Sequence, residues 1–253
     1  MKINLSKCLT ASLIAFAVPA SANVHKFALG AEGFSYKYRE PGVMADKGNL
    51  YGVSGEYSYA WSNGIFIQPE LRYAYGKTSY RSHRTGRMGR HTPNHLVETR
   101  FLTGYTHSFS PTLTITPFIG LGYRYKRDES AGMVSSTGHY GYHRESNYLY
   151  IPIGLKANQQ LGEKCALEGS TEYDVFIGGR QHSHLPSGSV SNDQHHGYGA
   201  RAELLLSTKF TTSKLAVGPF INYWKIKDSK VESGVYEPRN TTTELGVKIK
   251  YTF

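Results

Sequence analysis

The sequence has too few cysteines for the disulfide framework of a small exported domain, and too few long apolar runs for a transmembrane helix. It has two cysteines in 253 residues. Cys8 lies in an N-terminal segment that we expect to be removed, so disulfide bonds are not the expected framework of the exported chain. The mean hydropathy is negative, and beyond the N-terminal segment no apolar run approaches the roughly 20 residues of a transmembrane helix. A membrane β-barrel is not excluded, because its strands alternate apolar and polar faces.

The N-terminal segment has the layout of a cleaved secretory signal. A basic start precedes a short apolar run at residues 8–18, and Ala20 and Ala22 supply small residues at the cleavage positions. The run is too short to span a membrane as a helix. We therefore expect residues 1–22 to be removed and residues 23–253 to form one domain. The alternative is an uncleaved membrane anchor.

Period-two alternation of residue types dominates the rest of the chain. From residue 65 to 76, Ile, Ile, Pro, Leu, Tyr and Tyr alternate with Phe, Gln, Glu, Arg, Ala and Gly. Because successive side chains of a strand point to opposite faces, the pattern predicts strands with one apolar and one polar face. The same pattern recurs along the chain. We expect ten strands, near residues 25–39, 47–60, 65–80, 94–108, 112–126, 146–158, 164–178, 196–209, 214–228 and 239–253.

Short turns and longer loops alternate between these strands. The shorter connections include Ser62-Asn63-Gly64 and Ser110-Pro111. The longer ones are expected at residues 40–46, 81–93, 127–145, 179–195 and 229–238. An even number of antiparallel strands places the turns and both chain ends at one rim and the loops at the other. The predicted fold is all-β, a ten-stranded antiparallel up-and-down transmembrane β-barrel.

A soluble lipocalin-like barrel or a β-sandwich would also alternate, but the strand lengths and the aromatic residues count against both. The expected strands have about 12 to 16 residues, whereas strands of globular proteins usually have about five or six. Aromatic residues also end the apolar faces repeatedly, as at Tyr57, Trp61 and Tyr125. Such rings are typical of the two membrane interfaces. The polar faces carry more charge than an ordinary soluble core.

The pattern resembles the small Gram-negative outer-membrane β-barrel superfamily, which includes the OmpA-, OmpX- and Opa-like proteins. Its most specific feature here is the final strand, which ends in Tyr251-Thr252-Phe253. In that superfamily a terminal aromatic residue is part of the signal read by the barrel-assembly machinery. The resemblance covers the whole mature chain. It implies signal-dependent export, assembly by that machinery and a place in the outer membrane of a Gram-negative bacterium.

The polar faces predict a charged barrel lumen. Charges away from bulk water need partners, so we expect ion pairs such as Glu70 with Arg100 and Glu172 with Arg201. A barrel of about eight strands is filled by its side chains, whereas wide pores need about sixteen. Ten strands favour a plugged lumen over a narrow, porin-like passive channel. The predicted lumen network comprises Glu70, Arg72, Glu98, Arg100, Arg124, Glu172, Arg201 and Glu203.

The second loop is strongly basic and has no acidic residue. It carries Arg81, Arg84, Arg87 and Arg90. Basic clusters attract polyanions, so we expect contact with lipopolysaccharide phosphates, or alternatively binding of an anionic host polymer. No nucleic-acid-binding module accompanies the net charge of +10. We therefore expect no nucleic-acid partner, and a monomeric barrel.

Loop histidines are the remaining candidates for chemistry. Converging imidazoles could bind a metal ion or haem. The candidates are His139, His143, His182, His184, His195 and His196. No cysteine or closely spaced carboxylate completes a recognised site, so no cofactor is expected. Asp193 and His195 resemble half of the catalytic set of the ten-stranded omptin proteases, but the opposing aspartate pair is missing. We expect a non-enzymatic envelope or surface role, with a channel, a protease or a metal- or haem-capture protein as the alternatives.

Overall fold

The computed structural model describes residues 23–231 and 234–253. The predicted signal segment, residues 1–22, lies outside the described residues. Within the described part of the chain, no helix is long and apolar enough to cross a membrane.

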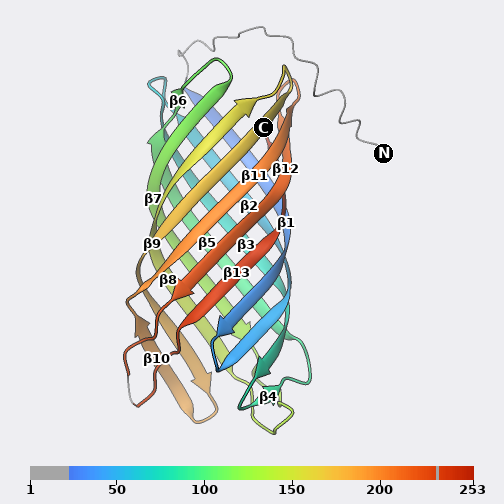
Figure 1. Cartoon of the computed structure of the whole chain (residues 1–253), viewed down its shortest axis with the longest axis vertical. Coiled ribbons are helices and arrows are strands. Elements are labelled where there is room, and N and C mark those ends of the chain that lie inside the picture. The colour runs from blue at the N-terminus through green and yellow to red at the C-terminus, as the bar shows by residue number, and fades with distance from the viewer. Residues whose placement is uncertain (1–22, 232–233) are drawn as a thin grey trace, which may run out of the picture.

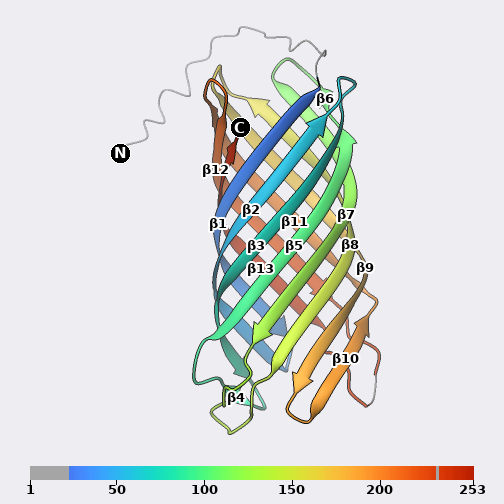
Figure 2. The same ribbon diagram turned by 180° about the vertical axis from the view of Figure 1, so that it is seen from behind.

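Ten long strands close into one antiparallel barrel, as the sequence predicted (Figures 1 and 2). Each pairs with its neighbour in the chain, and β1 closes the ring by pairing with β13, placing Leu29 opposite Tyr251. The ten strands are β1 (Val24–Glu40), β2 (Met44–Ala60), β3 (Ile65–Ser82), β5 (Thr92–Tyr105), β7 (Leu113–Glu129), β8 (His143–Gln160), β9 (Cys165–Leu185), β11 (Gly197–Lys209), β12 (Lys214–Ile226) and β13 (Asn240–Thr252).

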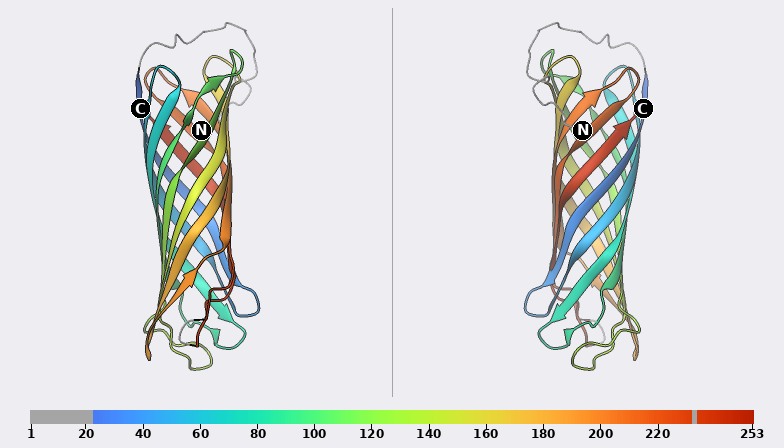
Figure 3. Two further views of the ribbon diagram at one scale, coloured as in Figure 1. Left: turned by 90° about the vertical axis from the view of Figure 1, so that its left-hand side faces the viewer. Right: turned by 90° about the vertical axis from the view of Figure 1, so that its right-hand side faces the viewer.

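The chain connects the strands by short turns at one rim, here called the turn end, and by longer segments at the other, the loop end. The described chain starts and finishes at the turn end, where the backbone N–H of Phe27 donates to Phe253 at 3.1 Å and that of Phe253 donates back at 2.9 Å. Figure 3 shows the loops gathered at the opposite rim. This arrangement agrees with the predicted alternation of turns and loops.

Three short strands extend this barrel: β4 (Gly86–Arg87), β6 (His107–Ser108) and β10 (Gly188–Gln194). The prediction of a loop at residues 179–195 was wrong. Strand β9 continues to Leu185 and pairs with β10, forming a hairpin that projects at the loop end (Figure 1). Its residues alternate in exposure but are mostly polar on both faces, with Gln181 and Ser183 buried and His184 exposed. Because the hairpin has no apolar face, hydrophobic alternation did not reveal it.

Prolines interrupt the pairing without shifting the strands. Three gaps in the ladders each lie beside a proline: Pro69 in β3, Pro152 in β8 and Pro219 in β12. The register is the same on both sides of each gap, because a proline removes only one donor. The register shift in the β8–β9 pair lies between Leu149 and Tyr150, two residues before Pro152.

A broad apolar band covers the outside of the barrel. Aliphatic side chains such as Leu29, Leu71 and Leu245 are each more than half exposed. Tyr51 and Tyr75 lie opposite each other at the edge of the band nearer the loop end. Aromatic residues also border the edge at the turn end, at Phe27, Tyr57, Tyr105, Phe210, Tyr251 and Phe253. A continuous exposed apolar surface of this kind needs a nonpolar surrounding, and an apolar band between aromatic borders is typical of membrane barrels.

Candidate functional site

The middle of the lumen is occupied by a network of charged side chains centred on two buried carboxylates. The first is Glu244, which is fully buried. It accepts hydrogen bonds from Arg72 Nη2 at 2.9 Å, Arg124 Nη2 at 2.5 Å and Asn222 Nδ2 at 3.0 Å. Arg72 Nε also donates to Glu32 Oε1 at 2.6 Å. Glu244 therefore joins arginines from β3 and β7 across the lumen.

The second carboxylate is Glu98 on β5. Arg201 donates to both of its oxygens, from Nη2 at 2.6 Å and from Nη1 at 2.9 Å. The Tyr150 hydroxyl donates to Glu98 Oε1 at 2.8 Å. The same arginine donates from Nε to Asp174 Oδ2 at 2.8 Å. A two-point contact between arginine and a carboxylate is among the stronger hydrogen-bonded arrangements.

The two ion pairs proposed from the sequence are present. Arg100 Nε donates to Glu70 Oε2 at 2.7 Å, and Arg201 Nε lies 3.1 Å from Glu172 Oε1. Arg100 Nη1 also donates to Glu172 Oε1 at 2.7 Å, which links the two pairs. Glu203 lies nearer the turn end and accepts from Lys248 Nζ at 3.1 Å instead. Seven of the eight predicted residues thus form one connected group, and Glu203 pairs separately with Lys248.

An aromatic layer packs between the central network and the loop end, and it was not predicted. Trp224 is fully buried, and Tyr150 meets it edge-on with ring centroids 5.0 Å apart. The Arg124 guanidinium lies 5.7 Å from the Trp224 ring, and that of Arg72 lies 5.0 Å from the Phe34 ring. Cation–π contact stabilises guanidinium groups away from water. The sequence contains a signal for this layer, because the even-numbered positions of β1 carry aromatic residues on the same face as Glu32.

A second charged cluster lies closer to the loop end. Arg144 Nη1 donates to Glu40 Oε1 at 2.7 Å, and Arg144 Nη2 lies 3.4 Å from Asp46 Oδ2 and 3.3 Å from Asp128 Oδ2. Lys126 Nζ lies over the Tyr38 ring at 4.0 Å. Most of these residues fell in or beside predicted loops. Strands longer than expected carry them into the lumen.

The segment between β12 and β13 brings one more carboxylate to this cluster. The Tyr38 hydroxyl donates to Glu40 Oε1 at 2.8 Å and faces Glu237 Oε1 at 3.5 Å. Burial, and then the negative charge of Glu40, raise the pKa of Glu237 to about 7. Glu237 therefore takes up a proton at a higher pH than an exposed glutamate would.

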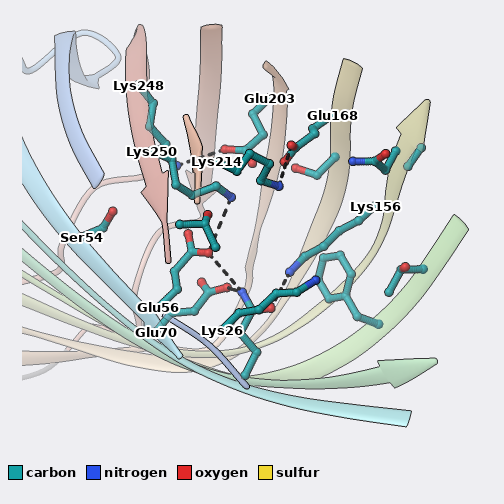
Figure 4. Close-up of a pocket in the computed structure, with 18 of the residues that line it drawn as sticks. Lys26, Ser54, Glu56, Glu70, Lys156, Glu168, Glu203, Lys214, Lys248 and Lys250 are labelled. Carbon is teal, nitrogen blue, oxygen red and sulfur yellow. Dashed lines mark hydrogen bonds and ion pairs between the residues drawn. The ribbon is translucent and has the colours of Figure 1, made fainter. Parts of the chain in front are cut away.

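On the turn-end side of the central network, the lumen widens into a cavity of about 860 Å³. Figure 4 shows lysines and glutamates projecting into this space from several strands. The lumen therefore has two parts. Buried ion pairs and rings occupy the middle and the loop-end half, and a polar chamber occupies the turn end.

Basic side chains also gather on the outside of the barrel, between the apolar band and the loop end. Lys37 faces Lys47 across the β1–β2 pair, and Arg81 faces Arg87 across the β3–β4 pair. Like charges placed directly opposite each other on neighbouring strands destabilise the pairing. None of these cations has a carboxylate within 4.0 Å among the described residues. We define the basic belt as the outward-facing residues Lys37, Arg39, Lys47, Lys77, Arg81 and Arg87.

The four arginines predicted in the second loop are divided by the fold. Arg81 and Arg87 belong to the belt, where strands β3 and β4 hold them side by side. Arg84 lies in the turn between these strands and Arg90 follows β4, and both are exposed. The backbone N–H of Arg87 donates to Ser136 Oγ at 3.1 Å, which attaches this loop to the next one.

The six candidate histidines do not gather into one cluster. His143 lies opposite His184 on the β8–β9 pair. Nδ1 of His182 is 2.7 Å from Ser191 Oγ, and His139 and His184 likewise contact neighbouring hydroxyls. His195 and His196 are exposed beside β10. Among the residues that the structure describes, no group of three His, Cys, Asp or Glu side chains could hold a metal ion.

Comparison with known proteins identifies the fold. No family model matches the chain, and no curated protein matches it. The outer-membrane protease OmpT from Escherichia coli matches with a TM-score of 0.58 and 13% identity, over 91% of this chain and 96% of that one. The translocator domain of autotransporter NalP from Neisseria meningitidis matches with a TM-score of 0.47 and 10% identity, over 98% and 91%. The chain has the fold of an outer-membrane β-barrel.

In this outer-membrane β-barrel fold, the likeness to OmpT concerns the architecture alone. Asp193, which together with His195 resembles half of the omptin catalytic set, lies opposite Arg180 on the hairpin. Arg180 donates to both of its carboxylate oxygens, at 2.6 and 3.1 Å. These hydrogen bonds lower the pKa of Asp193. The carboxylate is therefore an ionised partner of an arginine, with the exposed His195 two residues further along the chain.

Proposed function

We propose that this protein is a non-catalytic, monomeric barrel of a Gram-negative outer membrane, reached after signal-dependent export and assembly by the barrel machinery. We further propose that its lumen is closed and that its basic belt binds phosphate groups of the surrounding lipopolysaccharide. The observation that carries this proposal is the pair of like-charge contacts, Lys37 with Lys47 and Arg81 with Arg87. Each would be relieved by an anion bound between its two cations.

The height of the belt favours lipid headgroups over a soluble polymer. Lys77 is the next outward-facing residue after Tyr75, which borders the apolar band. Two residues of strand span about 7 Å. Lys47 lies four residues beyond Tyr51, or about 13 Å along β2. Both cations thus lie just beyond the loop-end edge of the apolar band, on the wall that faces the lipid, where headgroup phosphates would lie.

Two observations support the rest of the proposal. Glu98 and Glu244 are nearly or fully buried and tie arginines together across the lumen, which favours a closed barrel over the porin-like alternative. Asp193 is engaged by Arg180 at the hairpin, which favours a structural role over an omptin-like catalytic one.

Lipopolysaccharide binding can be tested on the refolded protein with a variant that interrupts both halves of the belt. Lys47→Gln combined with Arg81→Gln should weaken binding of purified lipopolysaccharide about tenfold or more, because each charge-assisted contact contributes about 1.5 to 3 kcal/mol. Raising the salt concentration should weaken binding to the native protein, because the contacts are electrostatic. Binding can be followed by the shift in unfolding temperature that the ligand produces.

The matched control is Lys227→Gln with Lys230→Gln, which removes the same charge at the loop end outside the belt. The control should bind like the native protein. Equal weakening in both variants would attribute binding to net charge and refute the belt. Loss of binding only on replacing Arg84 and Arg90 would move the site to the loop and favour the soluble host polymer.

A further inference from the structure

The chamber at the turn end contains lysines from opposite walls of the barrel. Lys26 projects from β1 and Lys156 from β8. In the order of strands around the ring, β8 is the strand opposite β1. Both side chains nevertheless line the same lobe of the chamber, with a volume of about 240 Å³. Figure 4 shows them entering the lobe from opposite sides.

The lobe has an unbalanced charge. Four lysines and one glutamate are its charged lining residues. Lys214 is paired with Glu168 at 2.7 Å and Lys250 with Glu56 at 3.6 Å. Lys26 and Lys156 have no carboxylate within 4.0 Å among the described residues.

Lys209, which also lines the chamber, likewise has no carboxylate within 4.0 Å among the described residues, but most other lumen cations are paired. Eight of them each have a carboxylate within 4.0 Å: Arg72, Arg100, Arg124, Arg144, Arg201, Lys214, Lys248 and Lys250. Lys126 has the Tyr38 ring 4.0 Å away. Lys156 has one neutral acceptor, Gln68 Oε1, at 3.1 Å, and its Nζ lies 5.6 Å from the Phe66 ring and 5.3 Å from the Phe118 ring, but no carboxylate balances its charge. An exogenous anion between Lys26 and Lys156 would supply the missing charge.

The remaining lining fits a phosphate group that carries a small organic part. The hydroxyls of Ser58, Thr106, Thr116 and Thr252 surround the lysines and can donate to phosphate oxygens. Ala28, Ala60 and Phe66 provide an apolar side to the same lobe. Two ammonium groups match the roughly two negative charges of a phosphate monoester at neutral pH.

Among the described residues, the contacts leave access to the lobe from the turn end alone. Towards the loop end, the Glu70–Arg100–Glu172 group and the buried network around Glu98 occupy the lumen. Sideways, β1 and β8 are each hydrogen-bonded to both neighbours, so a lipid cannot enter between strands. The ligand must therefore be a small soluble molecule from the compartment that the turn end faces.

We propose that the turn-end chamber is a binding site for a small soluble phosphate monoester, whose phosphate is held between Lys26 and Lys156. In the orientation of an outer-membrane barrel, this site opens to the periplasm. It is independent of the basic belt, which lies outside the barrel and at the other end.

Calorimetric titration of the refolded mature chain, in a nonionic detergent without phosphate groups, tests the site. Glycerol 3-phosphate is the probe and glycerol is the uncharged control. Saturable binding of one glycerol 3-phosphate per barrel is expected, with none of glycerol. Lys26→Gln with Lys156→Gln should weaken binding by about tenfold to a hundredfold, since two charge-assisted contacts are lost. Lys26→Arg with Lys156→Arg should retain it.

The matched control is again Lys227→Gln with Lys230→Gln, which removes two charges at the far end. Lys26→Gln alone guards against a folding defect, because this side chain is exposed and makes no ion pair among the described residues. It should weaken binding in the same direction. Absence of saturable binding to the native chain, or equal weakening in the control, would overturn the proposal. The belt variant should bind glycerol 3-phosphate normally, which separates this site from the lipopolysaccharide site.

Discussion

Replacing Glu244 with glutamine removes the charge at the centre of the lumen while keeping the shape of the side chain. Glu244 is fully buried and accepts from Arg72, Arg124 and Asn222. The amide can still accept through one oxygen, but its nitrogen would face a guanidinium group as a second donor. Arg124 would keep only the more distant Glu98, at 3.9 Å, as a compensating charge.

Breaking a buried ion pair by removing one partner costs about 3 to 5 kcal/mol, because the remaining charge is left uncompensated. Glu244 compensates two arginines, although Arg72 keeps Glu32 at 2.6 Å as a second partner. We therefore expect Glu244→Gln to lower the free energy of unfolding by about 3 to 5 kcal/mol. Urea unfolding of the refolded barrel in lipid vesicles measures this quantity.

The same substitution at Glu203 is the control. Glu203 contacts Lys248 at 3.1 Å, and both side chains are about one-fifth exposed, at 23% and 19%. Water in the chamber can replace this contact, so Glu203→Gln should cost about 1 kcal/mol or less. Equal effects of the two substitutions would refute the view that the central network holds the lumen together.

Three further predictions follow from particular contacts. Gly246→Ala should destabilise the barrel by about 1 to 3 kcal/mol in the same urea assay, because an added Cβ would lie 2.2 Å from the carbonyl oxygen of Gly33, whereas Gly55→Ala meets nothing within 4 Å and should be neutral. The pKa of Glu237 is raised from 4.5 to about 7. Protonated Glu237 therefore contributes stability that is fully present below pH 4.5 and is lost as the pH rises from 4.5 to about 7. Glu237→Gln should flatten that slope, and an unchanged slope would show that another group titrates. Neither the native protein nor the Asp193→Asn variant should cleave peptide substrates. Cleavage by the native protein that Asp193→Asn abolishes would show that the protein is a protease.

The barrel was predictable because most strands carry their own signal. In β3, Leu71 and Tyr73 point outwards and Arg72 points inwards, as their alternation indicated. Such segments and the connections between them predict the number of strands and their antiparallel order. They also predict that both described ends lie at the same rim of the barrel. The β9–β10 hairpin was missed because its polar residues show no hydrophobic alternation, and backbone pairing forms it.

The candidate sites were predictable where partners lie on adjacent strands. Glu70 and Arg100 are directly opposite on β3 and β5, so sharing the inward face was enough to propose the pair. Arg124 and Glu244 come from β7 and β13, which do not pair, and their contact depends on how the barrel closes and on its width. The belt likewise needed the register that places Lys37 opposite Lys47. Alternation in the sequence shows on which face of a strand each residue lies, but not which residue of the neighbouring strand lies opposite it.

Single-channel conductance of the refolded mature protein in a planar bilayer tests the closed lumen most directly. Insertion must first be established, for instance by protection of the barrel from protease. The closed network around Glu98 and Glu244 predicts a silent bilayer. It also predicts that Glu98→Gln combined with Glu244→Gln produces current if the barrel still inserts. Stable, ion-selective steps from the native protein would contradict the account and make Arg72, Arg100 and Arg124 candidate residues of a selectivity filter.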